Sequence, residues 1–231
     1  MYQASTRQDT WREREPPPEN LDMDGVVIPR IVFTGGPCGG KSVALERVQR
    51  HLETHRVKVY HVPEAATILL RGGILVKNAP MSHMVNFQRG IVRVQIALED
   101  ALDSFAQLRE EKAVLLCDRG VMDGAAYLPT SIWQKLLREE GLNETNLREK
   151  RYTAVIHLVT AAHGVEDSYS THTNAVRYED ADGARQVDER LRKVWRGHPR
   201  FSIIDTHPDF EEKIRRAVAV VCDLVGVPLP S

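Results

Sequence analysis

Residues Gly35 to Ser42 read GGPCGGKS, and they directly follow the apolar run Ile31 to Thr34. The spacing G-x-x-x-x-G-K-[ST] after a buried strand is typical of a loop whose backbone N–H groups curl around the phosphates of a nucleotide. Lys41 is expected to reach the β- and γ-phosphates, and the Ser42 hydroxyl is expected to ligate magnesium. The predicted nucleotide-binding residues of this loop are Gly35, Gly36, Pro37, Cys38, Gly39, Gly40, Lys41, Ser42 and Val43.

The residues on either side of the loop favour the same interpretation. Before it, Ile31, Val32 and Phe33 form a continuous apolar run, as expected of a parallel strand that is buried on both faces. After it, apolar residues recur at helical spacing, at Val43, Leu45, Val48 and Leu52. The phosphates would therefore lie at the N-terminus of a helix, where free N–H groups and the helix dipole favour an anion.

Composition limits the kind of protein that this can be. The 231 residues are 42% hydrophobic and 27% charged, which suits one α/β core with a small lid. A formal net charge of −1 argues against nucleic acid as the principal partner. No apolar stretch reaches the length of a membrane span, and the three cysteines lie far apart without metal-ligand spacing. We therefore expect a cytoplasmic protein with reduced thiols and no transmembrane segment.

The rest of the chain alternates short apolar runs with helical patterns, which is typical of a parallel sheet built from βαβ units. Residues 1–28 are expected to be a flexible polar tail, and residues 29–231 a single nucleotide-binding domain. A long helix is predicted over Ser82 to Gln107, between the second and third strands. The predicted strands are Arg30 to Thr34, Val57 to Val62, Ala113 to Cys117, Ala154 to Val159 and Phe201 to Asp205. The expected fold is therefore α/β, with a five-stranded parallel sheet flanked by helices in three layers, as in P-loop kinases.

A second motif stands at the carboxyl end of the third predicted strand, in VLLCDRG. Open α/β sheets bind their ligands at this edge. Asp118 can hold magnesium, or its water shell, opposite Ser42, and Arg119 can grip an anionic or polar acceptor. The alternative is that the pair makes a surface salt bridge or a strand-end turn. Behind a phosphate loop, the arrangement favours the catalytic interpretation.

The segment DRGVMDGAAY resembles the D-R-Y-x-x-S-x-x-A-Y signature of thymidylate kinases, with matches at Asp118, Arg119, Ala126 and Tyr127 and departures at Gly120 and Asp123. The whole pattern of GGPCGGKS, VPEAAT, NFQ, CDRG and RLRKVWRGHPRFSIIDT resembles the NadR/Ttd-type AAA domain family over Ile31 to Val225. That resemblance implies a domain similar to nucleoside and nucleotide kinases. Its translocation-defect-type members are similar in binding GTP.

Two further residues are candidates because their places in the sequence are similar to those of functional residues in deoxynucleoside kinases. Glu64 lies at a place similar to that of the glutamate which, in deoxynucleoside kinases, accepts the proton of the attacking hydroxyl. It could equally cap a helix or pair with an arginine. Gln88 resembles the glutamine with which those kinases read an acceptor base, although a solvated or core-lining amide fits the sequence too.

The segment of residues 162–199 is long, polar and rich in arginine, and we expect it to form a mobile lid over the phosphates. Val187, Leu191 and Trp195 make an apolar stripe at helical spacing. An arginine presented to the γ-phosphate would stabilise charge in the transition state. The candidates for this role are Arg177, Arg190 and Arg192. The alternative is an exposed helix with acid–base pairs such as Asp188 and Arg192.

The last predicted strand ends in IIDTHPD, where many nucleotide kinases contact the base. His207 and Pro208 are therefore candidate nucleotide-binding residues, although His207 could also be a surface residue before a helix. The Asn-Lys-x-Asp signature of regulatory GTPases is absent from the sequence, so ATP and GTP stay equal alternatives. No H-E-x-x-H motif or Cys/His cluster predicts zinc.

These patterns lead to two hypotheses that share one cofactor, Mg²⁺ with ATP or GTP. In the first, the protein is a kinase that transfers the γ-phosphoryl group to a small hydroxylated acceptor such as a nucleoside. In the second, it is a nucleotide-dependent module that reports the bound nucleotide to a protein partner, with slow or no hydrolysis.

Overall fold

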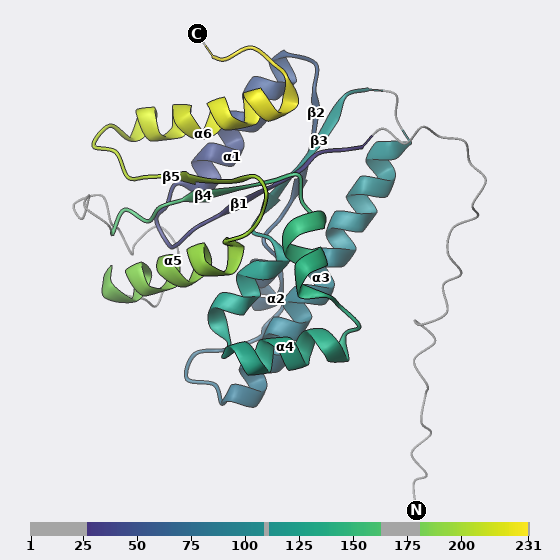
Figure 1. Ribbon diagram of the computed structural model, residues 1–231, viewed down its shortest axis with the longest axis vertical. Coiled ribbons are helices and arrows are strands. Elements are labelled where there is room, and N and C mark those ends of the chain that lie inside the picture. Colours follow the sequence, from purple (N-terminus) through teal and green to yellow (C-terminus); the bar gives the residue numbers. More distant parts are fainter. Residues whose placement is uncertain (1–26, 109–110, 163–180, 231) are drawn as a thin grey trace, which may run out of the picture.

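The computed structural model describes residues 27–108, 111–162 and 181–230 of the chain. Within them, five parallel strands form one sheet in the order β2-β3-β1-β4-β5 (Figure 1). The strands are β1 (Arg30–Thr34), β2 (Lys58–Val62), β3 (Ala113–Asp118), β4 (Ala154–Leu158) and β5 (Phe201–Ile204). The predicted α/β class and the five-stranded parallel sheet are confirmed.

Helices cover both faces of the sheet (Figure 1). On one face lie α1 (Lys41–Thr54) and α6 (Phe210–Val225), and on the other lie α3 (Met81–Gln107) and α5 (Ala181–Trp195). The shorter elements are α2 (Ala65–Arg71), the 3-10 helix η1 (Val121–Tyr127), α4 (Thr130–Glu139) and the π-helical turn η2 (Asn146–Lys150). The sheet is therefore the middle of three layers, as the sequence predicts.

β1 is the central strand, because it pairs with β3 on one side and with β4 on the other. Successive side chains of a strand point to opposite faces, so Ile31 and Phe33 pack into the cluster under α1 and α6. Val32 packs instead into the cluster that contains Trp195 of α5. The side chains of Ile31, Val32 and Phe33 are all fully buried, which explains the uninterrupted apolar run.

The predicted elements agree with the observed ones except at some of their ends. β2 begins at Lys58 and not at Val57, because the N–H group of Val57 donates to Leu52 O and closes the end of α1. β3 extends one residue further, to Asp118, while β4 ends at Leu158 and β5 ends at Ile204. The long helix predicted from Ser82 begins at Met81.

The predicted tail of residues 1–28 falls almost wholly outside the described residues. Ile28, at its end, is described and is 5% exposed, packed in the same cluster as Val32. The tail prediction is wrong for this residue, because an apolar side chain next to β1 can cover the edge of the core. Within the three described ranges, no helix has the length and apolar character needed to cross a membrane.

Gly35 occupies the tightest backbone position at the carboxyl end of the sheet. Its φ angle is +130°, and a Cβ atom there would lie 2.1 Å from Leu158 O. Gly39 also faces that carbonyl group, at 2.5 Å from the position of a Cβ atom. The loop after β1 therefore passes so close to β4 that no side chain fits, and this constraint fixes its path.

We predict that Gly35→Ala lowers the free energy of unfolding by more than about 3 kcal/mol, because it adds a clash with a strand backbone to the cost of a positive φ. Gly73→Ala is the matched control, since Gly73 has a φ of +98° and no atom within 4 Å of the added Cβ. This control substitution should lower the free energy of unfolding by about 1 kcal/mol. Urea unfolding measures both variants, and equal losses would contradict the steric account.

Candidate functional site

The phosphate loop connects β1 to α1 at the carboxyl edge of the sheet. Gly40 is the N-cap of α1, with a φ of 91°, and as a glycine it has no side chain to cap the helix. Among the described residues no side chain accepts from the first N–H groups of α1, and such free N–H groups can bind an anion. Cys38 also has a positive φ, of 56°, so the loop turns sharply at a residue other than glycine.

Lys41 folds back over its own loop. Its Nζ atom donates to Gly35 O at 3.0 Å and to Gly36 O at 2.9 Å. Burial, followed by the charge of Arg119, lowers the pKa of Lys41 to about 8, while neighbouring carboxylates such as Asp118 act in the opposite direction. The ammonium is thus poorly compensated, and a phosphate would supply the negative charge that it lacks.

Asp118 ends β3 and lies beside the first residues of the loop, since it pairs in register with Phe33. Burial raises the pKa of Asp118, against the opposing charges of Lys41 and Arg119. No hydrogen bond or ion pair engages its carboxylate within the part of the chain that is described. A free carboxylate and the exposed Ser42 hydroxyl provide the oxygen ligands that Mg²⁺ prefers, so the donor set fits this ion.

The Arg119 side chain is already occupied. Its Nε atom donates to Glu64 Oε1 at 2.6 Å, and one terminal nitrogen donates to Asp123 Oδ2 at 3.0 Å and to Gly35 O at 3.4 Å. The backbone of Arg119 has a φ of 75°, which is uncommon for a residue with a side chain. Arg119 therefore joins α2, η1 and the phosphate loop, and the predicted grip on an acceptor would need one of these contacts to open.

Asp123 belongs to the candidate site, although in the sequence it is marked only by its departure from a kinase signature. It is 4% exposed, and both carboxylate oxygens lie within 2.9 Å of Thr34 Oγ1. Trp195 Nε1 donates to Asp123 Oδ1 at 2.6 Å. With Arg119, three donors from β1, α5 and the end of β3 satisfy this buried charge.

Glu64 occupies the N-cap position of α2 but caps nothing, because its side chain reaches Arg119 and accepts a hydrogen bond from Thr67 Oγ1. Burial alone would raise the pKa of Glu64, but Arg119 and Thr67 more than offset this and hold it below its ordinary value. Of the alternatives left by the sequence, the pairing with an arginine is the arrangement observed.

Gln88 lies on the core side of α3 and is 3% exposed, so the solvated alternative does not apply. Its Oε1 atom has no hydrogen-bond partner among the described residues. The same atom lies 2.9 Å from where a Cβ atom of Gly124 would stand, so the amide faces η1. A buried hydrogen-bond acceptor without a partner lowers the stability of the fold, and a polar group of a ligand could donate to it.

A second buried carboxylate, Asp188 of α5, holds the phosphate loop from the other side. Asp188 Oδ1 accepts from the N–H groups of Gly36 at 2.8 Å and Thr160 at 3.1 Å, and it lies 3.1 Å from His157 Nε2. Burial acts to raise the pKa of Asp188, but these hydrogen bonds lower it below its ordinary value. The sequence suggested an exposed pair with Arg192, whereas Asp188 is fully buried.

Helix α5 packs against the rest of the domain through its apolar side chains. Val187 and Leu191 pack against Ala126 of η1, and Trp195 is fully buried. Arg190 Nε donates to Ala126 O at 2.9 Å, and Arg192 Nε lies 3.3 Å from Asp188 Oδ2. The predicted pair of Asp188 and Arg192 is therefore present, but it lies on a helix whose apolar stripe is packed into the domain. Arg177, the third predicted lid arginine, lies outside the described residues.

Beside the phosphate loop, a cavity of about 240 Å³ opens after β5. His207 and Pro208, the two residues predicted to contact the base, both line it. The other lining residues are Cys38, Ala161, Thr206, Phe210 and Lys213. Phe210 and Lys213 could not be recognised in the sequence, since neither belongs to a motif.

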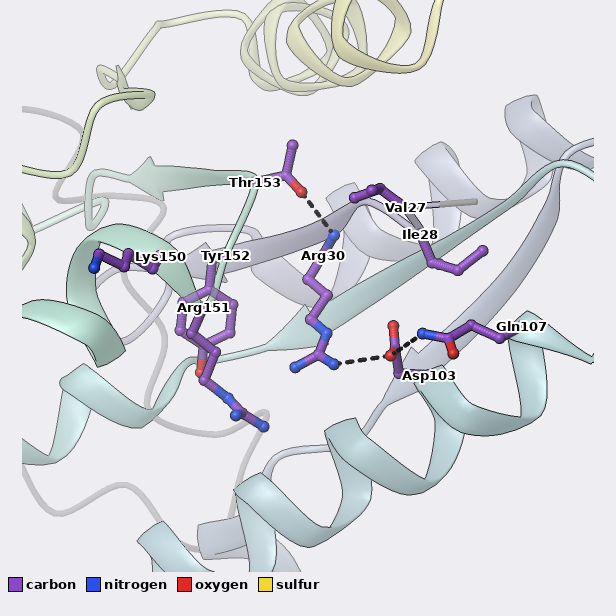
Figure 2. Close-up of a pocket in the computed structure, with 9 residues that line it drawn as sticks. All are labelled: Val27, Ile28, Arg30, Asp103, Gln107, Lys150, Arg151, Tyr152 and Thr153. Atoms are coloured by element: carbon purple, nitrogen blue, oxygen red, sulfur yellow. Dashed lines mark hydrogen bonds and ion pairs between the residues drawn. The ribbon is translucent and has the colours of Figure 1, made fainter. Parts of the chain in front are cut away.

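A second cavity, of about 330 Å³, lies at the opposite end of the sheet, where β1 begins. Figure 2 shows Arg30 there between Thr153 and Asp103. Its backbone N–H donates to Thr153 Oγ1 at 3.1 Å, and its guanidinium lies 3.0 Å from Asp103 Oδ2. Because this arginine is already paired and lies far from the phosphate loop, the cavity plays no part in the candidate site.

We predict that Asp188→Asn lowers the free energy of unfolding by about 2 kcal/mol, because an amide places N–H donors against the donors that now surround the carboxylate. Asp182→Asn on the same helix is the control, since Asp182 is 78% exposed in its side chain and should change stability by less than about 0.5 kcal/mol. Thermal or urea unfolding compares them. Equal stability of the two variants would contradict the role given to Asp188.

Comparison with curated proteins gives no significant match to this sequence. A family model described as an AAA domain matches residues 30–213, which make up most of the chain. The match begins at β1 and includes the phosphate loop, Asp118 and Lys213. Proteins of this family bind nucleotides, and the geometry of the loop is suited to the same function. The chain therefore belongs to the AAA domain family of P-loop NTPases.

Proposed function

We propose that this P-loop protein is a magnesium-dependent phosphotransferase that uses ATP or GTP to phosphorylate a small hydroxylated acceptor, such as a nucleoside. The observation that carries the proposal is the convergence of Lys41, Asp118, Glu64 and Arg119 beside the phosphate loop. All four influence one another's charge, as the pKa shifts of Lys41, Glu64 and Asp118 record. Such clusters of perturbed groups are typical of active sites.

The chain's own residues suffice for the main tasks of phosphoryl transfer. Lys41 would leave the carbonyl groups of Gly35 and Gly36 and donate to the β- and γ-phosphates. Asp118 and Ser42 would hold magnesium, which supplies positive charge to the phosphates when bound. The N–H groups at the start of α1 would stabilise the negative charge on the β-phosphate that leaves with the nucleoside diphosphate.

The acceptor would lie on the side of Glu64 and Gln88. Its hydroxyl oxygen forms a bond to the γ-phosphorus, the bond from the γ-phosphorus to the bridging oxygen breaks, and the hydroxyl proton passes to a Glu64 carboxylate oxygen. The low pKa of Glu64 makes it a weak base while Arg119 is bound to it. Separation of this pair on acceptor binding would raise that pKa and free Arg119 for the acceptor.

A second function is a nucleotide-dependent regulatory module, as the resemblance to translocation-defect-type GTP-binding proteins suggests. The observation that favours it is that the candidate catalytic groups are engaged internally. Glu64 and Arg119 bind each other at 2.6 Å, and Arg190 binds Ala126 O. In such a protein the residues around the loop would report the bound nucleotide to a protein partner without turnover.

We predict that Lys41→Ala weakens the binding of Mg·ATP or Mg·GTP by at least about 30-fold, because it removes a charge-assisted hydrogen bond to phosphate. Lys135→Ala is the control, since the Lys135 side chain is 71% exposed and remote in sequence from the loop. Isothermal titration calorimetry measures both. Unchanged affinity in the Lys41 variant would contradict nucleotide binding through this loop.

Glu64→Gln separates the kinase from the regulatory module. We predict that it lowers acceptor-dependent transfer of labelled γ-phosphate by about 10²- to 10⁴-fold, with nucleotide affinity retained, because a carboxamide cannot take the proton. Thr67→Val removes the other partner of Glu64 but keeps the carboxylate, and should change turnover only a few-fold. The assay uses wild-type protein, both triphosphates and a panel of nucleosides. Nucleotide binding without any transfer to these acceptors would exclude the kinase function.

A further inference from the structure

The cavity beyond the phosphate loop has a volume and a place that suit the base of the nucleotide. Cys38 of the loop forms one wall, and Thr206 to Pro208, which follow β5, form another. Its volume of about 240 Å³ falls below the range of about 300–1,000 Å³ that is usual for whole drug-sized ligands. The cavity therefore fits one ring system of a larger ligand whose phosphates lie on the loop.

Phe210 provides an apolar surface in this cavity. Its ring carbons lie 3.0 and 3.2 Å from the position that a Cβ atom of Gly40 would occupy, so the ring rests against the phosphate loop. The residue, at the start of α6, is nonetheless 43% exposed. A planar base that stacks on this ring would bury apolar surface on both partners.

Lys213 is the charged residue of the cavity wall, and it is only 3% exposed. Its Nζ atom donates to Val159 O at 2.6 Å, the one acceptor assigned to it among the described residues. Burial lowers the pKa of Lys213 to about 8, while Asp188 and Asp205 act in the opposite direction. At pH 7 the group is therefore mostly an ammonium, which has three N–H donors and no acceptor.

We propose that Lys213 reads the 6-oxo edge of a guanine base, so that this site selects GTP over ATP. This inference rests on the nucleotide binding proposed above. Along one edge, guanine presents two acceptors, O6 and N7, whereas adenine presents N7 and the N6 amino donor. The ammonium can satisfy both guanine acceptors, but adenine would place a donor against a donor. A contact of this kind discriminates between bases by about 10- to 100-fold.

The test compares the dissociation constants of Mg·GTP, Mg·ITP and Mg·ATP, measured by calorimetry on the whole protein. Inosine carries the 6-oxo group of guanine but lacks the 2-amino group, so it isolates the edge assigned to Lys213. In wild-type protein we expect GTP and ITP to bind with similar affinity, each at least about 10-fold more tightly than ATP. Equal binding of ITP and ATP would overturn the inference without any variant.

Lys213→Met tests the residue itself. The affinity of this variant for GTP and ITP should fall to its affinity for ATP. Its affinity for ATP should stay within about 3-fold of the wild-type value, which also shows that the variant is folded. Lys112→Met is the matched control, because Lys112 also donates to a backbone carbonyl, Val225 O, at 2.5 Å. A preference for GTP that survives in the Lys213 variant would overturn the assignment. Failure of all three nucleotides to bind wild-type protein would instead contradict the proposed function.

Discussion

The geometry of the candidate site depends on the hydrogen bonds of one buried carboxylate, that of Asp123. These bonds join three elements that meet beside the phosphate loop. The carboxylate accepts from Thr34 at the end of β1, from Trp195 in α5 and from Arg119 after β3. A buried charge is tolerated only with such partners, and removal of one partner from a buried pair costs about 3–5 kcal/mol. The strand ends, α5 and the side chain of Arg119 are therefore positioned together, and Asp188 completes the arrangement by binding the N–H group of Gly36.

Much of the fold could be predicted because its signals are local. The apolar run of β1 is continuous because both faces of the strand are buried, and the glycines of the loop are required by contacts such as that of Gly35 with Leu158 O. The carboxylates of Asp123 and Asp188 could not be predicted in the same way. Their partners lie up to 152 residues away in the chain. The sequence alone does not distinguish an aspartate that will be buried from one that will be exposed. The same holds for Lys213, whose acceptor Val159 belongs to a different layer of the fold.

The geometry also changes the roles that the sequence suggested for the polar residues. For Glu64 the sequence leaves a catalytic base, a helix cap and a partner of an arginine as alternatives, and the structure shows it paired with Arg119 at 2.6 Å. Lys41 is turned toward its own loop, and helix α5 is packed into the core through Trp195. In the proposed phosphotransferase, Lys41 and the pair of Glu64 and Arg119 would therefore exchange internal partners for phosphate and acceptor groups. The free energy for that exchange has to come from nucleotide binding.

Whether residues Gly35 to Ser42 hold the phosphates can be seen in a crystal structure with magnesium and a non-hydrolysable guanosine triphosphate analogue. We expect hydrogen bonds from the backbone N–H groups at the start of α1 to the β-phosphate, with Lys41 Nζ moved from Gly35 O and Gly36 O onto phosphate oxygens. A nucleotide bound elsewhere, or a Lys41 side chain still bonded to those two carbonyl groups beside a bound triphosphate, would contradict this expectation.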